Sequence, residues 1–287
     1  RFVALDVSII ATGGTARYLK EFGVGFTPIE EVTGNPESFD GRIKTVSFQI
    51  EAGILFDRAN KKHGEEAKKL KIPQIDFVVC NFYPFWEKPE LETIDIGGPT
   101  MVRAAAKNYE HVMVLVDPAD YGKVLDESRQ TRKELSAKAL SYVADYDIRI
   151  AKYFQEQTGE KDRHFISMDN GVTLRYGENP HQKGYFYQDP TGSDDPLNVG
   201  GFHILQGKQM SFNNLLDISA GLETISLIGK EEPAATVIKH TNPCGAAVGT
   251  DLADAFKKAW FDGDPLAAFG GVIVVNRTVT GEAAKLM

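Results

Sequence analysis

Lys239 and His240 stand side by side in the segment VIKHTNPCGAAVG, directly after a run of apolar residues. The apolar run predicts a buried strand, and Thr-Asn-Pro-Cys-Gly predicts a sharp turn after it. A histidine is well suited to move protons near neutral pH, and a neighbouring ammonium can tune it or stabilise a developing anion. The alternative is a solvated lysine beside a core histidine. Because unusual backbone geometry gathers at working sites, we favour a catalytic pair.

A second polar segment, LRYGENPHQ, contains Arg175, Tyr176, Asn179 and His181. The first part of the chain has a different feature, Thr12-Gly13-Gly14-Thr15, between a predicted strand and a predicted helix. Backbone amides, two hydroxyls and the positive helix end can converge there on a phosphate. The motif is neither a Walker loop nor a GxGxxG fingerprint, so a glycine turn that serves only packing is the alternative.

Two groups of charged residues could complete a site near this turn. Arg42 and Lys44 of GRIKT would share one face of an extended segment and could neutralise a phosphate; a solvated strand edge is the alternative. Asp95 precedes a predicted Gly-Gly-Pro turn and a helix with Arg103 and Lys107 on one face. An acid at a strand end facing two cations suits acid–base chemistry and anion binding, whereas a structural ion pair is the equal alternative.

Composition limits the classes of function. The 287 residues suggest about two domains, and 42% hydrophobic with 25% charged residues is typical of a globular protein. A net charge of −8 disfavours nucleic acid or acidic membranes as partners. Without an apolar run of about 18 residues or a signal segment, we expect a cytoplasmic protein. Cys80 and Cys244 form no CxxC motif and predict no metal site; Cys244 is expected to fill a tight turn rather than act as a nucleophile.

The elements that must position these residues alternate between strands and helices. VSIIA, IDFVVCNFYPF and HVMVLVDP predict strands, and ARYLKEFG predicts a helix that ends at a glycine. This alternation favours a three-layer α/β fold with a mostly parallel sheet. From residue 135, apolar residues recur at spacings of three and four and predict one face of a long helix: Leu135, Ala139, Val143, Tyr146, Ile150 and Phe154. We expect domains at 1–168 and 169–287, and an exposed loop at DPTGSDDPLNVGG.

Eight motifs together resemble the AICAR transformylase/IMP cyclohydrolase family of bifunctional purine biosynthesis enzymes. They occur in family order and cover nearly the whole chain: TGGT, GRIKT, CNFYPF, DIGGPTMVRAAAKN, LRYGENPHQ, SFNNLLD, IKHTNPCGAAVG and AFGGVIVVN. The resemblance implies formyl transfer from 10-formyltetrahydrofolate to AICAR, giving FAICAR, and then closure of FAICAR to IMP with loss of water. It also implies a methylglyoxal-synthase-like cyclohydrolase domain, part of a cytidine-deaminase-like transformylase domain, and a homodimer without a metal in this segment.

The resemblance also assigns roles to matching positions. In the cyclohydrolase, the phosphate and ribose would be bound by Thr12, Gly13, Gly14, Thr15, Arg42, Lys44 and Thr45. Tyr83, Asp95, Lys107 and Asn108 would lie around the reacting groups, with Lys107 at the oxyanion and Asp95 moving a proton. In the transformylase, His240 would be the base and Lys239 its partner, and the substrate would be bound by Arg175, Tyr176 and Asn214.

The chain departs from the family pattern at several places. Ser47 and Glu51 stand where two histidines are usual, which puts any role of those histidines in doubt. The opening Ser-Asp-Lys segment is absent, and the chain stops at Met287 before the usual end of the transformylase, so we expect a fragment with poor formyl transfer by itself. The alternatives are a purine-nucleotide-binding fragment or sensor with impaired catalysis and, less favoured, a methylglyoxal-synthase-like lyase.

Overall fold

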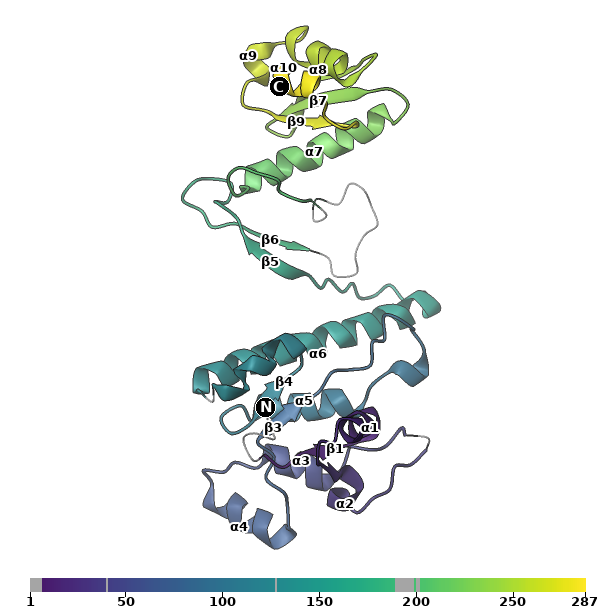
Figure 1. Cartoon of the computed structure of the whole chain (residues 1–287), viewed down its shortest axis with the longest axis vertical. Coiled ribbons are helices and arrows are strands. Elements are labelled where there is room, and N and C mark those ends of the chain that lie inside the picture. Colours follow the sequence, from purple (N-terminus) through teal and green to yellow (C-terminus); the bar gives the residue numbers. More distant parts are fainter. Residues whose placement is uncertain (1–6, 40, 127, 189–198, 200–201) are drawn as a thin grey trace. The chain divides into compact units, whose positions relative to one another are not determined.

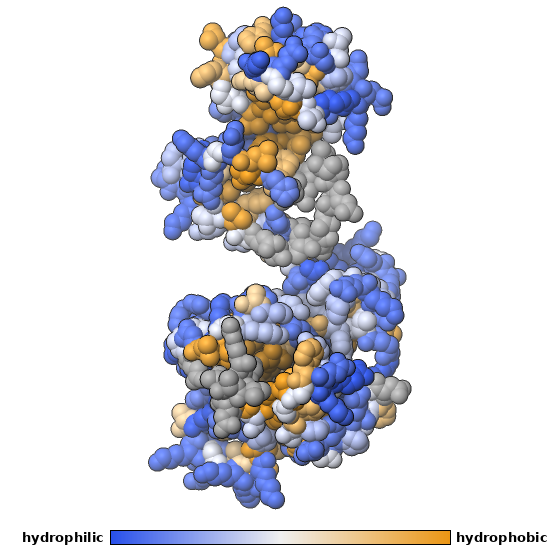
Figure 2. Space-filling model, viewed as in Figure 1, coloured by the Kyte–Doolittle hydropathy of each residue, from blue (hydrophilic) through white to orange (hydrophobic). Residues whose placement is uncertain are grey.

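The computed structural model describes residues 7–39, 41–126, 128–188, 199 and 202–287. Within it the chain divides into two compact units, Arg1–Phe165 and Ile166–Met287. The loop predicted at DPTGSDDPLNVGG, residues 189–201, lies outside the described residues apart from residue 199. The visible face of each unit is largely hydrophilic, with hydrophobic residues showing between the polar ones (Figure 2).

Among its described residues, unit 1 contains four short strands and a larger set of helices (Figure 1). The strands are β1 (Ile10–Ala11), β2 (Thr27–Pro28), β3 (Phe77–Val79) and β4 (Met113–Leu115). The α-helices are α1 (Gly13–Glu21), α2 (Ile29–Thr33), α3 (Phe48–Leu55), α4 (Lys61–Leu70), α5 (Gly97–Lys107) and α6 (Arg129–Thr158). Two 3₁₀ segments, η2 (Leu91–Thr93) and η3 (Pro118–Leu125), precede α5 and α6.

The strands of unit 1 pair in parallel, β1 with β2 and β3 with β4, which confirms the α/β prediction. The described strands form two separate pairs rather than one continuous sheet. The first pair is short because α1 begins at Gly13, directly after the extended Thr12, and β3 ends at Val79, before the Tyr-Pro turn. Strand β4 is buried along its whole length, so this pair lies in the core of the unit.

The long helix predicted from residue 135 is α6, and its apolar face packs on this core. Leu135, Ala139, Val143 and Tyr146 are buried, whereas the last predicted member, Phe154, is 39% exposed. Ser128 caps the helix by accepting a hydrogen bond from Thr131 N at 3.2 Å. The predicted period therefore holds over most of the helix and ends where the helix extends beyond the core.

Unit 2 is built on antiparallel pairs. A hairpin, β5 (Asp169–Thr173) with β6 (Tyr185–Gln188), precedes α7 (Phe212–Ile228), and a three-stranded sheet follows in the order β8-β7-β9. Its strands are β7 (Ala234–Lys239), β8 (Asn242–Val248) and β9 (Val272–Val275), and its other helices are α8 (Leu252–Phe261), α9 (Pro265–Ala268) and α10 (Gly281–Leu286).

The central strand β7 is covered by helices on both faces (Figure 1). On one face α7 comes close at Gly221, where an added Cβ would lie 3.1 Å from Ile238 Cγ1. On the other, Phe256 of α8 packs with Val237. Residues Ala234–Ile238 are therefore buried, and the strand delivers its last residue to the edge of this helix–sheet–helix arrangement.

Candidate functional site

The start of α1 forms a turn that faces a lysine. Gly13 has φ +55°, a left-handed conformation that favours glycine, and a Cβ added there would lie 3.4 Å from Lys44 Nζ. The first amides of a helix lack partners within the helix and carry a partial positive charge. Thr12 Oγ1 is buried and has no hydrogen-bond partner among the described residues. The amides of Gly14 and Thr15, this hydroxyl and the Lys44 ammonium can together bind a phosphate.

Arg42 does not join Lys44, although the two were expected on one face. The expectation is wrong because residues 41–47 form turns and bends rather than an extended segment. The guanidinium of Arg42 pairs with Glu92, and both side chains are exposed. Lys44 instead lies 3.0 Å from Glu37 Oε1. Exposed ion pairs are weak, so Arg42 can be drawn toward a bound anion, whereas the Lys44 side chain is only 22% exposed.

The start of α5 is the second glycine-rich helix start near Lys44. A Cβ on Gly97 would collide with Thr45 Oγ1, so the Thr45 side chain packs directly on this glycine. A Cβ on Gly98 would lie 2.6 Å from Asp95 Oδ2 and 3.0 Å from Cys80 Sγ. Because Lys44 and Thr45 are consecutive, this short segment links the starts of α1 and α5. Gly97 and Gly98 belong to the first helical turn, not to a turn before the helix as predicted.

Asp95 is the half-buried acid at this helix start. Its Oδ1 accepts a hydrogen bond from Gly98 N at 2.9 Å, and amides of Tyr83 and Gly97 add further bonds to the carboxylate. Burial raises the pKa of Asp95 although these hydrogen bonds lower it. Burial and the charge of Asp95 raise the pKa of Cys80 to about 12, so this thiol remains protonated. A buried carboxyl with a raised pKa is suited to hold and transfer a proton.

The other members predicted around Asp95 lie elsewhere. Lys107 is the last residue of α5, about 15 Å along the helix axis from Gly97 at 1.5 Å per residue. Arg103 pairs with Asp147 at 3.5 Å, and the Asn108 amide donates to Ile54 O at 2.6 Å. The structure therefore does not bring Lys107 or Arg103 to Asp95, because Lys107 lies at the opposite end of α5 and Arg103 is paired with Asp147. Tyr83 contacts Asp95 through its backbone, and its side chain is 53% exposed.

In unit 2, Lys239 ends β7 and His240 begins a two-residue turn into β8. His240 and Thr241 have φ of 54° and 62°, and Lys239 pairs with Asn242 across the turn. Two left-handed residues are typical of the tight hairpin turns whose twist matches the flanking strands. The prediction that Lys239 and His240 stand at the end of a buried strand is confirmed. The His240 side chain is exposed at this turn.

The predicted place of the turn within this segment is wrong, because Asn242–Val248 forms β8. Proline is tolerated there since β8 is an edge strand of the sheet. Pairing shifts between Ile238 with Pro243 and Val237 with Gly245, which leaves Cys244 as the extra residue of a bulge. Its thiol donates to Val237 O at 3.4 Å, so Cys244 belongs to the strand and does not fill the turn.

The Lys239 ammonium is already partly bound. It donates to the carbonyls of Ala267 and Phe269 at 3.2 and 3.0 Å, at the end of α9. An ammonium has three donors, so one remains for a ligand. The two carbonyls hold Lys239 beside the His240 turn.

Arg175 and Tyr176 belong to a separate segment that packs beside the start of α7. Arg175 N donates to Met210 O at 2.9 Å, and Phe212 N donates to Tyr176 O at 3.1 Å. The Arg175 guanidinium lies 4.9 Å from the Tyr176 ring centre and donates to its hydroxyl at 3.2 Å. Hydrogen bonds from Ser211 and then Arg175 lower the pKa of Tyr176. Asn214 forms a capping box with Ser211, so its carbonyl oxygen supports the helix start.

Sequence reasoning missed Asp217. Its Oδ1 accepts a hydrogen bond from Thr241 N at 2.8 Å and so joins the His240 turn to α7. The available signal was its spacing in SFNNLLD, four residues after Asn213 and thus on the same helix face. Helix α7 therefore contains Asn214 and contacts both the Arg175–Tyr176 segment and the His240 turn.

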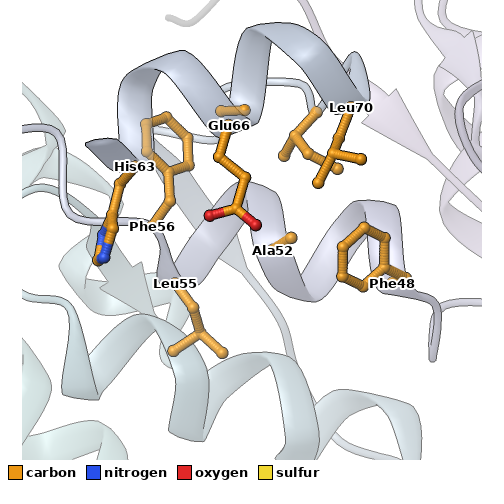
Figure 3. Close-up of a pocket in the computed structure, with 9 residues that line it drawn as sticks. Phe48, Ala52, Leu55, Phe56, His63, Glu66 and Leu70 are labelled. Atoms are coloured by element: carbon orange, nitrogen blue, oxygen red, sulfur yellow. The ribbon is translucent and has the colours of Figure 1, made fainter. Parts of the chain in front are cut away.

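Unit 2 and unit 1 each contain a pocket. One, beside Tyr176, is lined by Gly177, Glu178, Gln182, Lys183, Gly184, Tyr185 and Phe212. The other is a largely apolar groove between α3 and α4, lined by Phe48, Ala52, Leu55, Phe56, His63, Glu66, Ala67, Leu70 and Ile72 (Figure 3). The predicted site residues do not line this second groove, which places it outside the candidate chemistry.

Within the described ranges, we find no cluster of three or more His, Cys, Asp or Glu side chains arranged to hold a metal ion. The same part of the chain contains no helix long and apolar enough to span a membrane.

Comparison with known proteins gives two family matches. Residues 105–287 match the AICARFT/IMPCHase bienzyme model, and residues 1–110 match the MGS-like domain model. Two relatives are the bifunctional purine biosynthesis proteins PurH of Halalkalibacterium halodurans and Anoxybacillus flavithermus. Their alignments cover 98% of this chain, with sequence identities of 43% and 44%. The chain spans 58% of the length of each. A structure described as the crystal structure of ForH aligns with 53% of this chain and 88% of its own, at 34% identity and a TM-score of 0.48.

Proposed function

The chain belongs to the AICARFT/IMPCHase bienzyme family, and we propose on this premise that it serves the last two steps of IMP synthesis. In the first step, the 5-amino group of AICAR takes a formyl group from 10-formyltetrahydrofolate and becomes FAICAR. In the second, FAICAR closes to IMP with loss of water. Unit 1 would perform the closure, and unit 2 would contribute to the transfer.

The observation that carries the first assignment is the Lys44–Thr45 segment between two glycine-rich helix starts. Ring closure is intramolecular, so the enzyme gains most by holding the carboxamide nitrogen against the formyl carbon. The start of α1 and Lys44 would bind the phosphate, which anchors one end of the substrate. Asp95, whose pKa is raised by burial, would move a proton as the tetrahedral intermediate loses water.

Lys107 is the residue for which resemblance and geometry differ. The resemblance assigns it to the oxyanion of the intermediate, whereas its position at the far end of α5 supports no contact with Asp95. We therefore propose Lys44, Thr45 and Asp95 as the reactive group of unit 1. Lys107 keeps its predicted role only if its removal alters closure.

In unit 2, His240 would act as the base that removes a proton from the weakly nucleophilic amine as it attacks the formyl carbon. Lys239 would stabilise charge on the formyl oxygen with its remaining donor. The Arg175 guanidinium would bind the AICAR phosphate. Tyr176 and Asn214 would lie beside the heterocyclic base of AICAR. The support is that one helix, α7, contacts both the Tyr176 segment and the His240 turn.

The partners of the protein follow from the same proposal. They are the purine ribonucleotides AICAR, FAICAR and IMP, with 10-formyltetrahydrofolate as co-substrate and no nucleic acid or membrane. A cytoplasmic homodimer is the form that we propose for the active enzyme.

Ultraviolet-monitored conversion of FAICAR to IMP without folate tests the proposal. The protein should close the ring faster than the uncatalysed reaction, and Lys44→Ala should remove most of this gain. Lys61→Ala, on α4 and outside the site, is the control for loss of a surface charge. Lys107→Ala in the same series tests whether Lys107 acts in ring closure, since its removal should then slow the closure of FAICAR. FAICAR that binds but closes at the uncatalysed rate would leave a purine-nucleotide-binding protein instead of a cyclohydrolase.

A further inference from the structure

Asp217 contacts the His240 turn from a separate element. It is a half-buried residue of α7, and its Oδ1 accepts the hydrogen bond from Thr241 N at 2.8 Å. The carbonyl of this peptide unit is bound from within the hairpin, since Thr241 Oγ1 and Asn242 Nδ2 donate to His240 O at 2.7 and 2.9 Å. The hydrogen bond to Asp217 therefore attaches the peptide between His240 and Thr241 to helix α7.

The peptide unit between His240 and Thr241 needs such support. Both residues have positive φ, which is uncommon outside glycine and is an outlier for a β-branched threonine. A strained backbone persists only where the surrounding structure over-determines it. Here hydrogen bonds hold both the N–H and the carbonyl of the peptide. Together they set ψ of His240 and φ of Thr241, and thus the direction in which the His240 Cβ leaves the backbone.

Helix α7 also fixes the other end of the candidate site. Phe212 N donates to Tyr176 O, and Ser211 with Asn214 caps the helix. Asp217 lies five residues after Phe212, about 7.5 Å along the axis. One rigid helix thus sets the separation between the Tyr176 segment and the His240 turn.

We propose that Asp217 is a positioning residue that orients the His240 imidazole toward a substrate held at Arg175 and Tyr176. The inference rests on the proposed function of unit 2, in which His240 is the base of formyl transfer. In this role Asp217 acts through the Thr241 amide, to which it is hydrogen-bonded. The property that matters is its acceptor oxygen, which asparagine also has and alanine lacks.

Steady-state formyl transfer by the full-length protein that contains this chain, with Asp217→Ala and Asp217→Asn, tests this role. A misplacement of about 1 Å can cost about 100-fold in rate, so Asp217→Ala should lower kcat by about that factor with little change in the KM for AICAR. Asp217→Asn should restore most of kcat. The matched control is Asp254→Ala, which removes a carboxylate that accepts from Thr250 N at 3.0 Å in α8, away from the turn.

A second measurement separates this inference from the proposed function. In the 287-residue chain, Asp217→Ala should speed hydrogen exchange at the Thr241 amide and shift the His240 ring signals in NMR spectra, and Asp254→Ala should do neither. A full-length unsubstituted protein without formyl transfer would overturn the proposed function, and the NMR result on the 287-residue chain would then decide the positioning role. Three results would overturn the positioning role of Asp217. They are unchanged His240 signals in Asp217→Ala, equal kcat losses in both alanine variants, and failure of Asp217→Asn to restore kcat.

Discussion

The start of α5 and the β7–β8 turn hold their reactive groups in opposite ways. At α5 the acid is half-buried, and two glycines make room for Thr45, Asp95 and Cys80 to pack against the helix. At the turn the histidine is exposed, and two non-glycine residues adopt positive φ. Close packing positions the first group, whereas hydrogen bonds to a strained backbone position the second. The first should be sensitive to added volume, and the second to lost acceptors.

Of the substitutions that test this difference, Gly98→Ala is expected to have the largest effect on stability and on the rate of FAICAR closure. The new Cβ would lie 2.6 Å from Asp95 Oδ2, so the carboxylate must move. Overpacking of this kind costs about 1–3 kcal/mol, and the displaced acid should slow FAICAR closure about 100-fold. Gly64→Ala on α4, where a Cβ meets nothing within 4 Å, is the control and should not reduce stability. Urea denaturation and closure kinetics measure both effects; an unaffected Gly98→Ala would show that packing does not position Asp95.

Thr241→Gly should have a smaller effect and the opposite sign on stability. Glycine adopts φ near 62° without steric cost, so the free energy of unfolding should rise by about 0.5–1 kcal/mol after the entropy cost of glycine. Formyl transfer should fall at the same time, because the turn becomes looser and loses the Thr241 hydroxyl bond to His240 O. Denaturation and kcat on the same samples give the answer. A less stable Thr241→Gly variant would mean that the turn carries no strain.

The smallest expected effect is a pH dependence at Asp95. Burial raises the pKa of this carboxyl, so the folded protein binds its proton more tightly than the unfolded chain. The contribution to stability is complete below the ordinary pKa of aspartate and is lost as pH rises through the folded value. Asp95→Asn removes this ionisation, so its stability relative to the unsubstituted protein should increase with pH over that interval. Denaturation at several pH values tests the sign, and a relative stability that decreases with pH would contradict it.

Local patterns in the sequence predicted much of the fold. The apolar period from residue 135 predicted α6 because a helix face repeats every three or four residues, and the burial of Leu135, Ala139 and Val143 agrees with it. The alternation of strands and helices predicted the parallel pairs of unit 1. The turn after Lys239 was placed too late, because its signal was Pro243 and Gly245, whereas the strained residues are His240 and Thr241.

The residue types of the candidate sites were determined by the sequence alone: a glycine turn with hydroxyls, the Lys44–Thr45 pair, a buried-segment aspartate and the Lys239–His240 pair. Which of these meet was decided only by the tertiary structure. Arg42 and Lys44 separate because their segment turns, and Lys107 lies far from Asp95 because a helix of fixed rise stands between them. Asp217 reaches Thr241 across 24 residues of chain. Contacts of this kind depend on how helices and strands pack, and spacing along the chain carries no direct record of that packing.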